Sequence, residues 1–150
     1  MLKNVHTHEW DNMIDVNCRG VTNCTAAFLP TMLQQQSGHI VNISSDAGRA
    51  VFPGLAVYSA TKFFVEAFTK GLRSETCGSG VKVTSIQPGD VKTAIAERNT
   101  DTEAVRECAQ QDPAKFLDVD DVARAVVYAV TQPKDCAVNE VLIEPRQCPI

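Results

Sequence analysis

The chain has 150 residues, of which 44% are hydrophobic and 21% charged, and its net charge is −4. This length suits a single domain, and the composition is ordinary for a globular protein. The weak negative charge, without any basic run, argues against nucleic acid or an anionic membrane as the main partner. The apolar stretches are too short and interrupted to span a bilayer. The six cysteines form no C-x-x-C pair and follow a polar N-terminus, so we expect reduced thiols and a cytoplasmic location.

The first half of the chain reads as helix, strand and helix. Residues 7–36 are predicted to form one long helix, which Thr7 caps and Pro30 kinks. A short strand follows, centred on "IVNI" at 40–43, and a loop rich in glycine and proline comes after it. Helical spacing of apolar residues returns over 58–76, and "CGSG" ends this second helix.

The second half repeats the alternation. "VKVTSIQP" at 81–88 is a predicted strand, and residues 90–117 are predicted to form a loop with short helices. A third helix is expected over 118–132, with acidic residues at its N-terminus, and "NEVLIEP" at 139–145 is the last strand. Helices that alternate with short apolar strands predict an α/β fold with a parallel sheet and crossover helices.

The most informative pair of side chains is Tyr58 and Lys62, which are four residues apart and share one helix face. A phenol ionises near pH 10, too high to exchange protons at neutral pH. A nearby ammonium favours the phenolate, so Lys62 is expected to lower the pKa of Tyr58. Taken alone, the same spacing also fits a pair that faces solvent.

Other polar residues are predicted to lie near this pair. Ser45 follows the first strand, and ligands of open parallel sheets bind beyond the carboxyl ends of the strands. Pro88 and Gly89 turn the chain at the end of the next strand, at the same edge. Asn17 is a polar residue midway along the first helix, where a buried hydrogen bond or a capped kink is the alternative explanation.

Four segments, "VNCRG", "GHIVNISS", "YSATK" and "PGDVKT", in this order and spacing, resemble the short-chain dehydrogenase/reductase family. The resemblance extends from "HEWDNMIDVN" to "NEVLIEP", which is nearly the whole chain. It implies a partial Rossmann-like (doubly wound) parallel sheet with flanking helices. It also implies hydride transfer between a nicotinamide cofactor and a secondary alcohol or carbonyl compound. The "NEVLIEP" ending resembles NADP-preferring alcohol dehydrogenases of broad substrate range, so NADP (or NAD) is the expected cofactor.

The resemblance assigns a role to each matching residue. Tyr58 would be the general acid/base, and Ser45 would orient the substrate oxygen. Lys62 would lower the pKa of the tyrosine and hold the nicotinamide ribose, and Asn17 would anchor a water in a proton relay. Ser44 is the weaker serine candidate, because alternation along the strand points it away from Ser45.

The turn after the second strand would contact the cofactor. Pro88 and Gly89 would turn the backbone into the cleft. The backbone of Val91 would then contact the nicotinamide amide, and Thr93 would lie near the diphosphate. The family uses the helices that contain Asn17 and Tyr58 as a subunit interface. A homo-oligomer, dimer or tetramer, is therefore expected.

One part of the family pattern is missing from this sequence. No glycine pattern G-x-x-x-G-x-G lies between a strand and a helix, and no Asn-Asn-Ala-Gly stretch occurs. Such a turn cradles the cofactor diphosphate at a helix N-terminus. We therefore expect residues 1–150 to form a truncated domain, the catalytic and C-terminal portion, whose N-terminal strands are absent and whose sheet has an unpaired edge.

Two other functions remain as alternatives. The chain could be a non-catalytic form that only associates with full-length subunits. Hydrolysis through Ser45 is the other, but it lacks a plausible base, since His6, His8 and His39 are the only histidines. The sequence also has no G-x-S-x-G nucleophile elbow. The H-x-H of His6 and His8 lacks further ligands, so no metal site is expected. The identity of the small-molecule substrate is left open.

Overall fold

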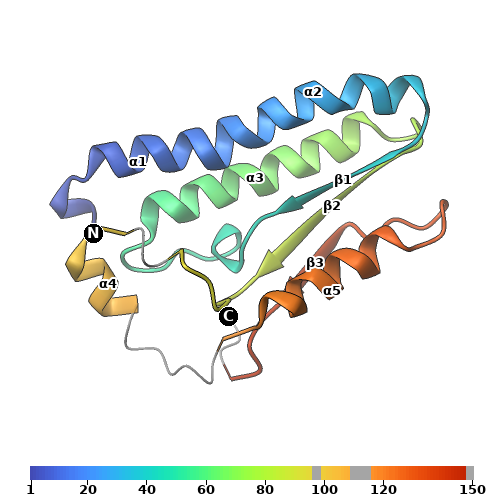
Figure 1. The fold of residues 1–150 in the computed structure, drawn as a ribbon. Coiled ribbons are helices and arrows are strands. Elements are labelled where there is room, and N and C mark those ends of the chain that lie inside the picture. Colours follow the sequence, from blue (N-terminus) through green and yellow to red (C-terminus); the bar gives the residue numbers. More distant parts are fainter. Residues whose placement is uncertain (96–98, 109–115, 148–150) are drawn as a thin grey trace.

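The computed structural model describes residues 1–95, 99–108 and 116–147. Its centre is a parallel sheet of three strands in the order β1-β2-β3, with helices on both faces (Figure 1). The strands are β1 (Gly38–Ile43), β2 (Val81–Pro88) and β3 (Glu140–Ile143). The predicted α/β fold, with a Rossmann-like parallel sheet and crossover helices, is confirmed, and β1 forms one edge of this sheet.

A long helical rod covers one side of the molecule (Figure 1). It consists of α1 (Thr7–Ile14), a wide π-helical segment η2 (Asp15–Arg19) and α2 (Gly20–Gln34). The departure from α-helical geometry falls in η2, whereas Pro30 lies inside α2 without ending it. Wide turns of this kind often occur at functional sites, and η2 contains Asn17.

The predicted cap of this rod is wrong. Thr7 is the first residue of α1, and His6 holds the cap position without a side-chain cap hydrogen bond. The reason is that the carbonyl of His6 already accepts from the amide of Trp10, so the helical hydrogen bonds begin one residue earlier.

Two further helices cover opposite faces of the sheet. Helix α3 (Ala56–Glu75) packs beside the rod, and α5 (Val119–Val130) packs on the other face (Figure 1). The short helix α4 (Thr102–Cys108) lies within the predicted loop region 90–117. Residues 96–98 and 109–115 of that region lie outside the described residues.

Apolar packing is concentrated between the sheet and α5. Ile86, Ala125 and Ala129 form its buried centre, at 0–8% exposure. Alternation along β2 places Ile86 on this face and Ser85 and Gln87 on the face toward α3. The turn between α3 and β2 requires a glycine at position 80, because φ is +84° and a Cβ there would lie 2.1 Å from a backbone oxygen.

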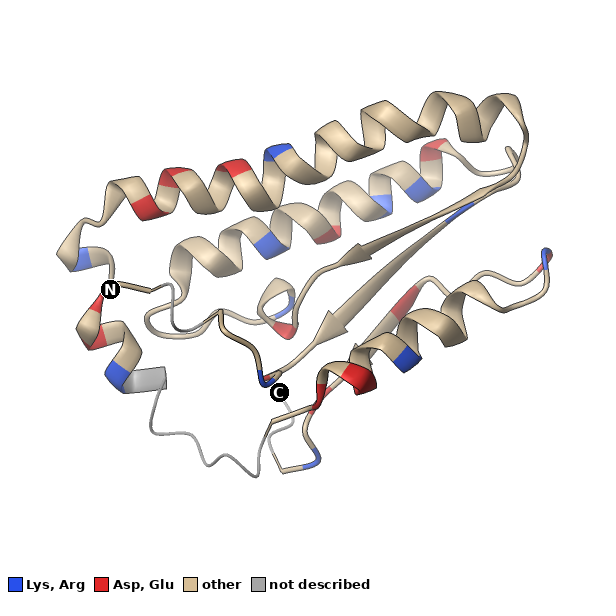
Figure 2. Cartoon of the chain, viewed as in Figure 1, with Lys and Arg blue, Asp and Glu red and all other residues tan. Residues whose placement is uncertain are grey.

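Surface charges of both signs are interspersed over the fold, except along α2, which has none (Figure 2). In the described ranges, no helix has the length and apolar content needed to cross a membrane. The described cysteines are free thiols, and the side chains of Cys108 and Cys148 lie outside the described part. The free thiols are Cys18, Cys24, Cys77 and Cys136.

Candidate active site

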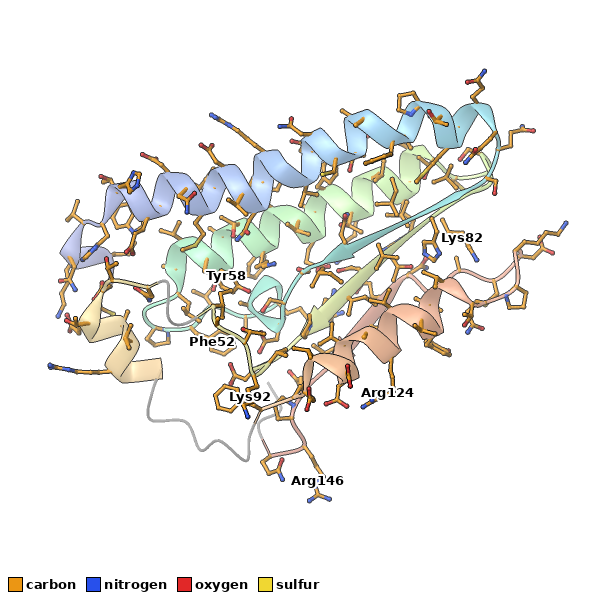
Figure 3. All side chains as sticks on the ribbon, in the orientation of Figure 1. Phe52, Tyr58, Lys82, Lys92, Arg124 and Arg146 are labelled. Carbon is orange, nitrogen blue, oxygen red and sulfur yellow. The ribbon has the colours of Figure 1, made fainter. Side chains whose placement is uncertain are left out.

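The predicted site residues gather at the carboxyl ends of β1 and β2. Ser45 follows β1 and caps the short helix η3 (Asp46–Gly48), while Tyr58 lies in the first turn of α3. Figure 3 shows Tyr58 at this end of α3, near Phe52 in the preceding loop. The turn that begins at Pro88 leaves β2 at the same edge of the sheet.

Ser45 is buried and its hydroxyl is held in place by its own turn. It donates to Asp46 Oδ1 at 2.7 Å and accepts from the amide of Ala47 at 3.1 Å. It also faces the Tyr58 phenol, whose pKa it lowers. By contrast, the Ser44 hydroxyl is buried, and among the described residues it has no hydrogen-bond partner. The fold therefore brings Ser45, and not Ser44, to the tyrosine.

Lys62 packs against Tyr58 from the same helix. Its ammonium lies 5.5 Å from the centroid of the phenol ring and donates to the carbonyl of Ile43 at 3.1 Å. Burial lowers the pKa of Lys62, whereas the Glu66 carboxylate and the Cys18 thiol raise it. The ammonium is thus held over the ring face by the end of β1.

The pKa of Tyr58 is raised, which is opposite to the direction predicted from Lys62. Burial of the phenol raises it most, and the neighbouring Ser45 hydroxyl lowers it. The carboxylates of Asp46 and Asp90 raise it further, because negative charge opposes ionisation of a phenol. In the cofactor-free chain the phenol is therefore protonated at neutral pH.

Asn17 is connected to the site by hydrogen bonds through Thr61, the residue that precedes Lys62. Its side-chain amide donates to the hydroxyl of Thr61 at 3.0 Å, and that hydroxyl donates to the carbonyl of Tyr58 at 2.7 Å. This chain joins the wide turn of η2 to the first turn of α3. The alternative of a partly buried hydrogen bond describes the Asn17 side chain, while a role in proton transfer stays a prediction.

The turn after β2 is anchored on both sides. Pro88 pairs with Ile143 of β3, and the amide of Gly89 donates to the Ile143 carbonyl at 2.8 Å. Val91 forms a parallel bridge with Leu117. The flanking backbone groups of residues 90 and 92 bond to Leu117, at 2.8 and 3.0 Å. Because backbone groups alternate along an extended chain, those of Val91 face the opposite side.

These groups fit the nicotinamide end of a dinucleotide. Lys62 offers an ammonium beside the phenol, and Val91 offers backbone donor and acceptor groups in a preformed turn. Thr93 is exposed, and its hydroxyl accepts from the amide of Ile95 at 3.4 Å. The residues that would hold a diphosphate at a glycine-rich turn have no counterpart in the sequence.

Several residues of the site were not predicted. Asp46 influences Tyr58 from η3 and Asp90 from the turn after β2, and Cys18 faces Lys62 from η2. Glu66 carries a signal that could have revealed it: it lies one helical turn after Lys62, on the helix face that bears Tyr58. Ser85 and Gln87, polar residues at alternate positions of an apolar strand, are its partners.

Comparison with known sequences places this arrangement among oxidoreductases. The profile of the short chain dehydrogenase family matches residues 1–104. A glycine betaine reductase of Emericella nidulans is 50% identical over 150 residues, which is all of this chain and 12% of that protein. An uncharacterized oxidoreductase of Staphylococcus aureus strain N315 is 48% identical over 139 residues, or 91% of this chain and 55% of that protein.

Among solved structures, the closed form of a serine dehydrogenase complexed with NADP+ is similar over 99% of this chain and 60% of its own. Its TM-score is 0.88 and its sequence identity is 33%. The chain thus spans 12% of the reductase and 55% of the S. aureus oxidoreductase. The family profile covers more than half of the chain, and so the chain belongs to the short-chain dehydrogenase family.

Proposed function

We propose that this protein is an NAD(P)-dependent oxidoreductase that transfers a hydride between a nicotinamide cofactor and a secondary alcohol or carbonyl compound. The observation that carries the proposal is the convergence of the Ser45 hydroxyl and the Lys62 ammonium on the Tyr58 phenol at the carboxyl end of a parallel sheet. Lys62 lies against the same phenol ring. Ligands of such sheets bind at this edge.

In the reducing direction, the protonated phenol of Tyr58 is the general acid. Its raised pKa keeps the proton in place until a carbonyl oxygen begins to gain charge. A reduced nicotinamide, when bound, would supply the hydride for the carbonyl carbon, while Tyr58 donates its proton to the carbonyl oxygen. The Ser45 hydroxyl orients that oxygen, which fixes the distance to the phenol. In the oxidising direction the tyrosine takes the proton back.

Lys62 and Asn17 support this exchange. The Lys62 ammonium favours the phenolate that remains after proton transfer, and it would bind the nicotinamide ribose. Asn17 holds η2 against Thr61, and from there it would anchor a water of the proton relay. Pro88, Gly89 and the backbone of Val91 would hold the nicotinamide, and Thr93 would lie toward the diphosphate. NADP is the favoured cofactor, since the similar serine dehydrogenase was solved with NADP+.

The test follows nicotinamide absorbance while purified protein, NADPH and a panel of carbonyl compounds are mixed, with the matching alcohols and NADP+ for the reverse direction. The panel includes serine and trimethylammonium compounds, because relatives carry names of that kind. The assay is run on this chain and on the longest natural protein that contains it. Turnover that disappears in Tyr58→Phe supports the proposal, and no turnover or equal turnover contradicts it.

A second candidate is a non-catalytic form that pairs with complete subunits. The uncharged helix α2 exposes Phe28, at 62%, and an apolar groove of about 520 Å³ lies between the N-terminal part of the rod, up to η2, and α3. Leu2, Ile14 and Phe64 line part of this groove. The matching helix surface of a complete subunit, in a dimer or tetramer, is the proposed occupant. Size exclusion combined with NADPH titration distinguishes the candidates, since an associating form elutes as an oligomer without binding NADPH.

A further inference from the structure

A buried carboxylate lies directly behind the candidate site. Glu66, one helical turn beyond Lys62, is 5% exposed and accepts two hydrogen bonds from β2. The Ser85 hydroxyl donates to Oε1 at 2.6 Å, and the Gln87 amide donates to Oε2 at 2.7 Å. Both donors are 0% exposed. A buried carboxylate is costly without such partners, so this arrangement specifies the position of α3 on β2.

Gln87 continues the connection to the turn that carries Ser45. Its carbonyl oxygen accepts from Arg49 Nε at 2.6 Å, and Arg49 Nη2 also donates to Glu140 at 2.7 Å. Arg49 follows η3 directly, and Gln87 directly precedes Pro88. Both polar atoms of the Gln87 amide are therefore engaged, the nitrogen with Glu66 and the oxygen with Arg49.

The turn itself lies against α3 at close range. A Cβ added to Gly48 would lie 3.0 Å from Glu66 Cγ, the Lys62 carbonyl oxygen and Ser44 Oγ. Only a residue without a side chain allows η3 to approach the helix this closely. The same helix surface thus carries the contacts with the turn and, through Glu66, the contacts with β2.

We propose that Glu66, Gln87 and Arg49 form a positioning unit that holds three parts of the site in register: the Ser45 turn, the Tyr58 helix and the Pro88–Gly89 turn. This inference rests on the proposed function, since it explains how the hydroxyls of Ser45 and Tyr58 are kept together. The three residues act through others and touch no reacting atom. The negative charge of Glu66 also affects the site electrostatically, because it raises the pKa of Lys62.

The phenol titration of Tyr58 tests the unit without cofactor or substrate. The sequence has only two tyrosines, so Tyr128→Phe, at an exposed position of α5, leaves Tyr58 as the sole phenol. Tyrosinate absorbance against pH then reports its pKa. The charged groups that face it are Lys62 on its own helix, Asp46 in η3 and Asp90 in the turn after β2. Ser45→Ala calibrates the method: the Ser45 hydroxyl lowers the pKa of Tyr58, so its loss is expected to raise that pKa.

Gln87→Met breaks both links without changing any charge, so a shift of the Tyr58 titration reports geometry alone. We expect a rise comparable to that of Ser45→Ala. The matched control is Thr84→Val on the other face of β2, which removes a buried hydroxyl bonded to the Val138 carbonyl at 2.6 Å. The control is expected to leave the titration unchanged. If Gln87→Met does not fold, Arg49→Lys decides, since it keeps the charge at a partly exposed position but loses the forked geometry.

In active protein, Gln87→Met should lower kcat about 10- to 100-fold while KM for the carbonyl substrate stays nearly constant, as expected for a loss of alignment. A titration that moves in Ser45→Ala but not in Gln87→Met or Arg49→Lys overturns the positioning unit and leaves the proposed function intact. A titration that does not move even in Ser45→Ala overturns the Ser45–Tyr58 pair, and with it both proposals.

Discussion

The two faces of β2 are built differently. Toward α5, Ile86 meets Ala125 and Ala129 in a dry apolar cluster. Toward α3, Ser85 and Gln87 bind the carboxylate of Glu66. Over residues 85–87 the strand alternates between these environments residue by residue, so one short segment of chain serves two purposes at once.

The difference separates stability from geometry. Apolar burial is non-directional and roughly proportional to area, so the α5 face favours folding without specifying side-chain orientation. Hydrogen bonds are directional, and a buried network specifies one arrangement at little net gain in stability. The polar face lies next to the candidate catalytic residues, where orientation matters. Substitutions on the two faces should therefore give opposite patterns of loss.

The largest effect on turnover is expected from a substitution of Tyr58, beside the polar face of β2. Tyr58→Phe removes the proposed proton donor, and general acid/base help is typically worth ~10²–10⁴ in rate. The ring packing survives, so the free energy of unfolding should hardly change. Turnover and thermal unfolding measured on the same preparation check both statements. A folded Tyr58→Phe variant with full turnover would remove Tyr58 from the mechanism.

Ser45→Ala and Ser44→Ala form the next pair. Loss of an orienting hydroxyl of this kind costs about 10²–10³ in kcat, so Ser45→Ala should slow turnover by that factor. Ser44→Ala removes a buried hydroxyl that has no hydrogen-bond partner among the described residues, so stability should hold or rise. Steady-state kinetics of both variants decide, and a larger loss in Ser44→Ala would contradict the position of Ser45.

The apolar face is tested by Ile86→Ala. Ile86 is 0% exposed, and truncation of such a side chain typically costs about 2–5 kcal/mol of unfolding free energy. Denaturant unfolding measures this loss. Val127→Ala, at an exposed position of α5, is the control and should stay within about 0.5 kcal/mol. The Tyr58 titration should be the same in both, because neither residue touches the polar face.

Much of the fold could be predicted from the sequence because its signals are local. Apolar spacing located the helices and strands to within a few residues, and their alternation predicted the parallel sheet. The π-helical segment η2 could not be predicted from that spacing, because it changes the backbone geometry without interrupting the pattern of apolar residues. The helix start at His6 depends on a backbone carbonyl, which no side-chain pattern reports.

The site was predicted only in part for a related reason. Tyr58 and Lys62 share a helix face, so their contact follows from spacing alone. The raised pKa of Tyr58 was missed because its causes, burial and the carboxylates of Asp46 and Asp90, come from the folded arrangement of separate loops. Gln87 was missed for the same reason: its partners Glu66 and Arg49 come from α3 and from the turn after β1.

The smallest effect concerns the pH dependence of stability, through Lys62. Burial lowers the pKa of this ammonium in the folded chain, whereas in the unfolded chain it is near 10.4. Between these two pKa values the unfolded chain holds a proton that the folded chain has lost. The contribution of Lys62 to stability therefore increases with rising pH, and it is unfavourable below this pH range.

Lys62→Met removes this increase, so its unfolding free energy should rise less, or fall more, in alkaline solution than that of the parent. The Cys18 thiol acts in the same direction: Lys62 lowers its pKa, so in the variant that thiol keeps its proton to higher pH in the folded chain. Urea unfolding at several alkaline pH values measures the difference, with Lys70→Met, an exposed lysine of the same helix, as the control for the lost charge. Parallel curves of unfolding free energy against pH for the parent and Lys62→Met would show that the Lys62 ammonium is solvated in the folded chain. Glu66, and not Lys62, would then be the last residue of α3 that belongs to the buried polar face.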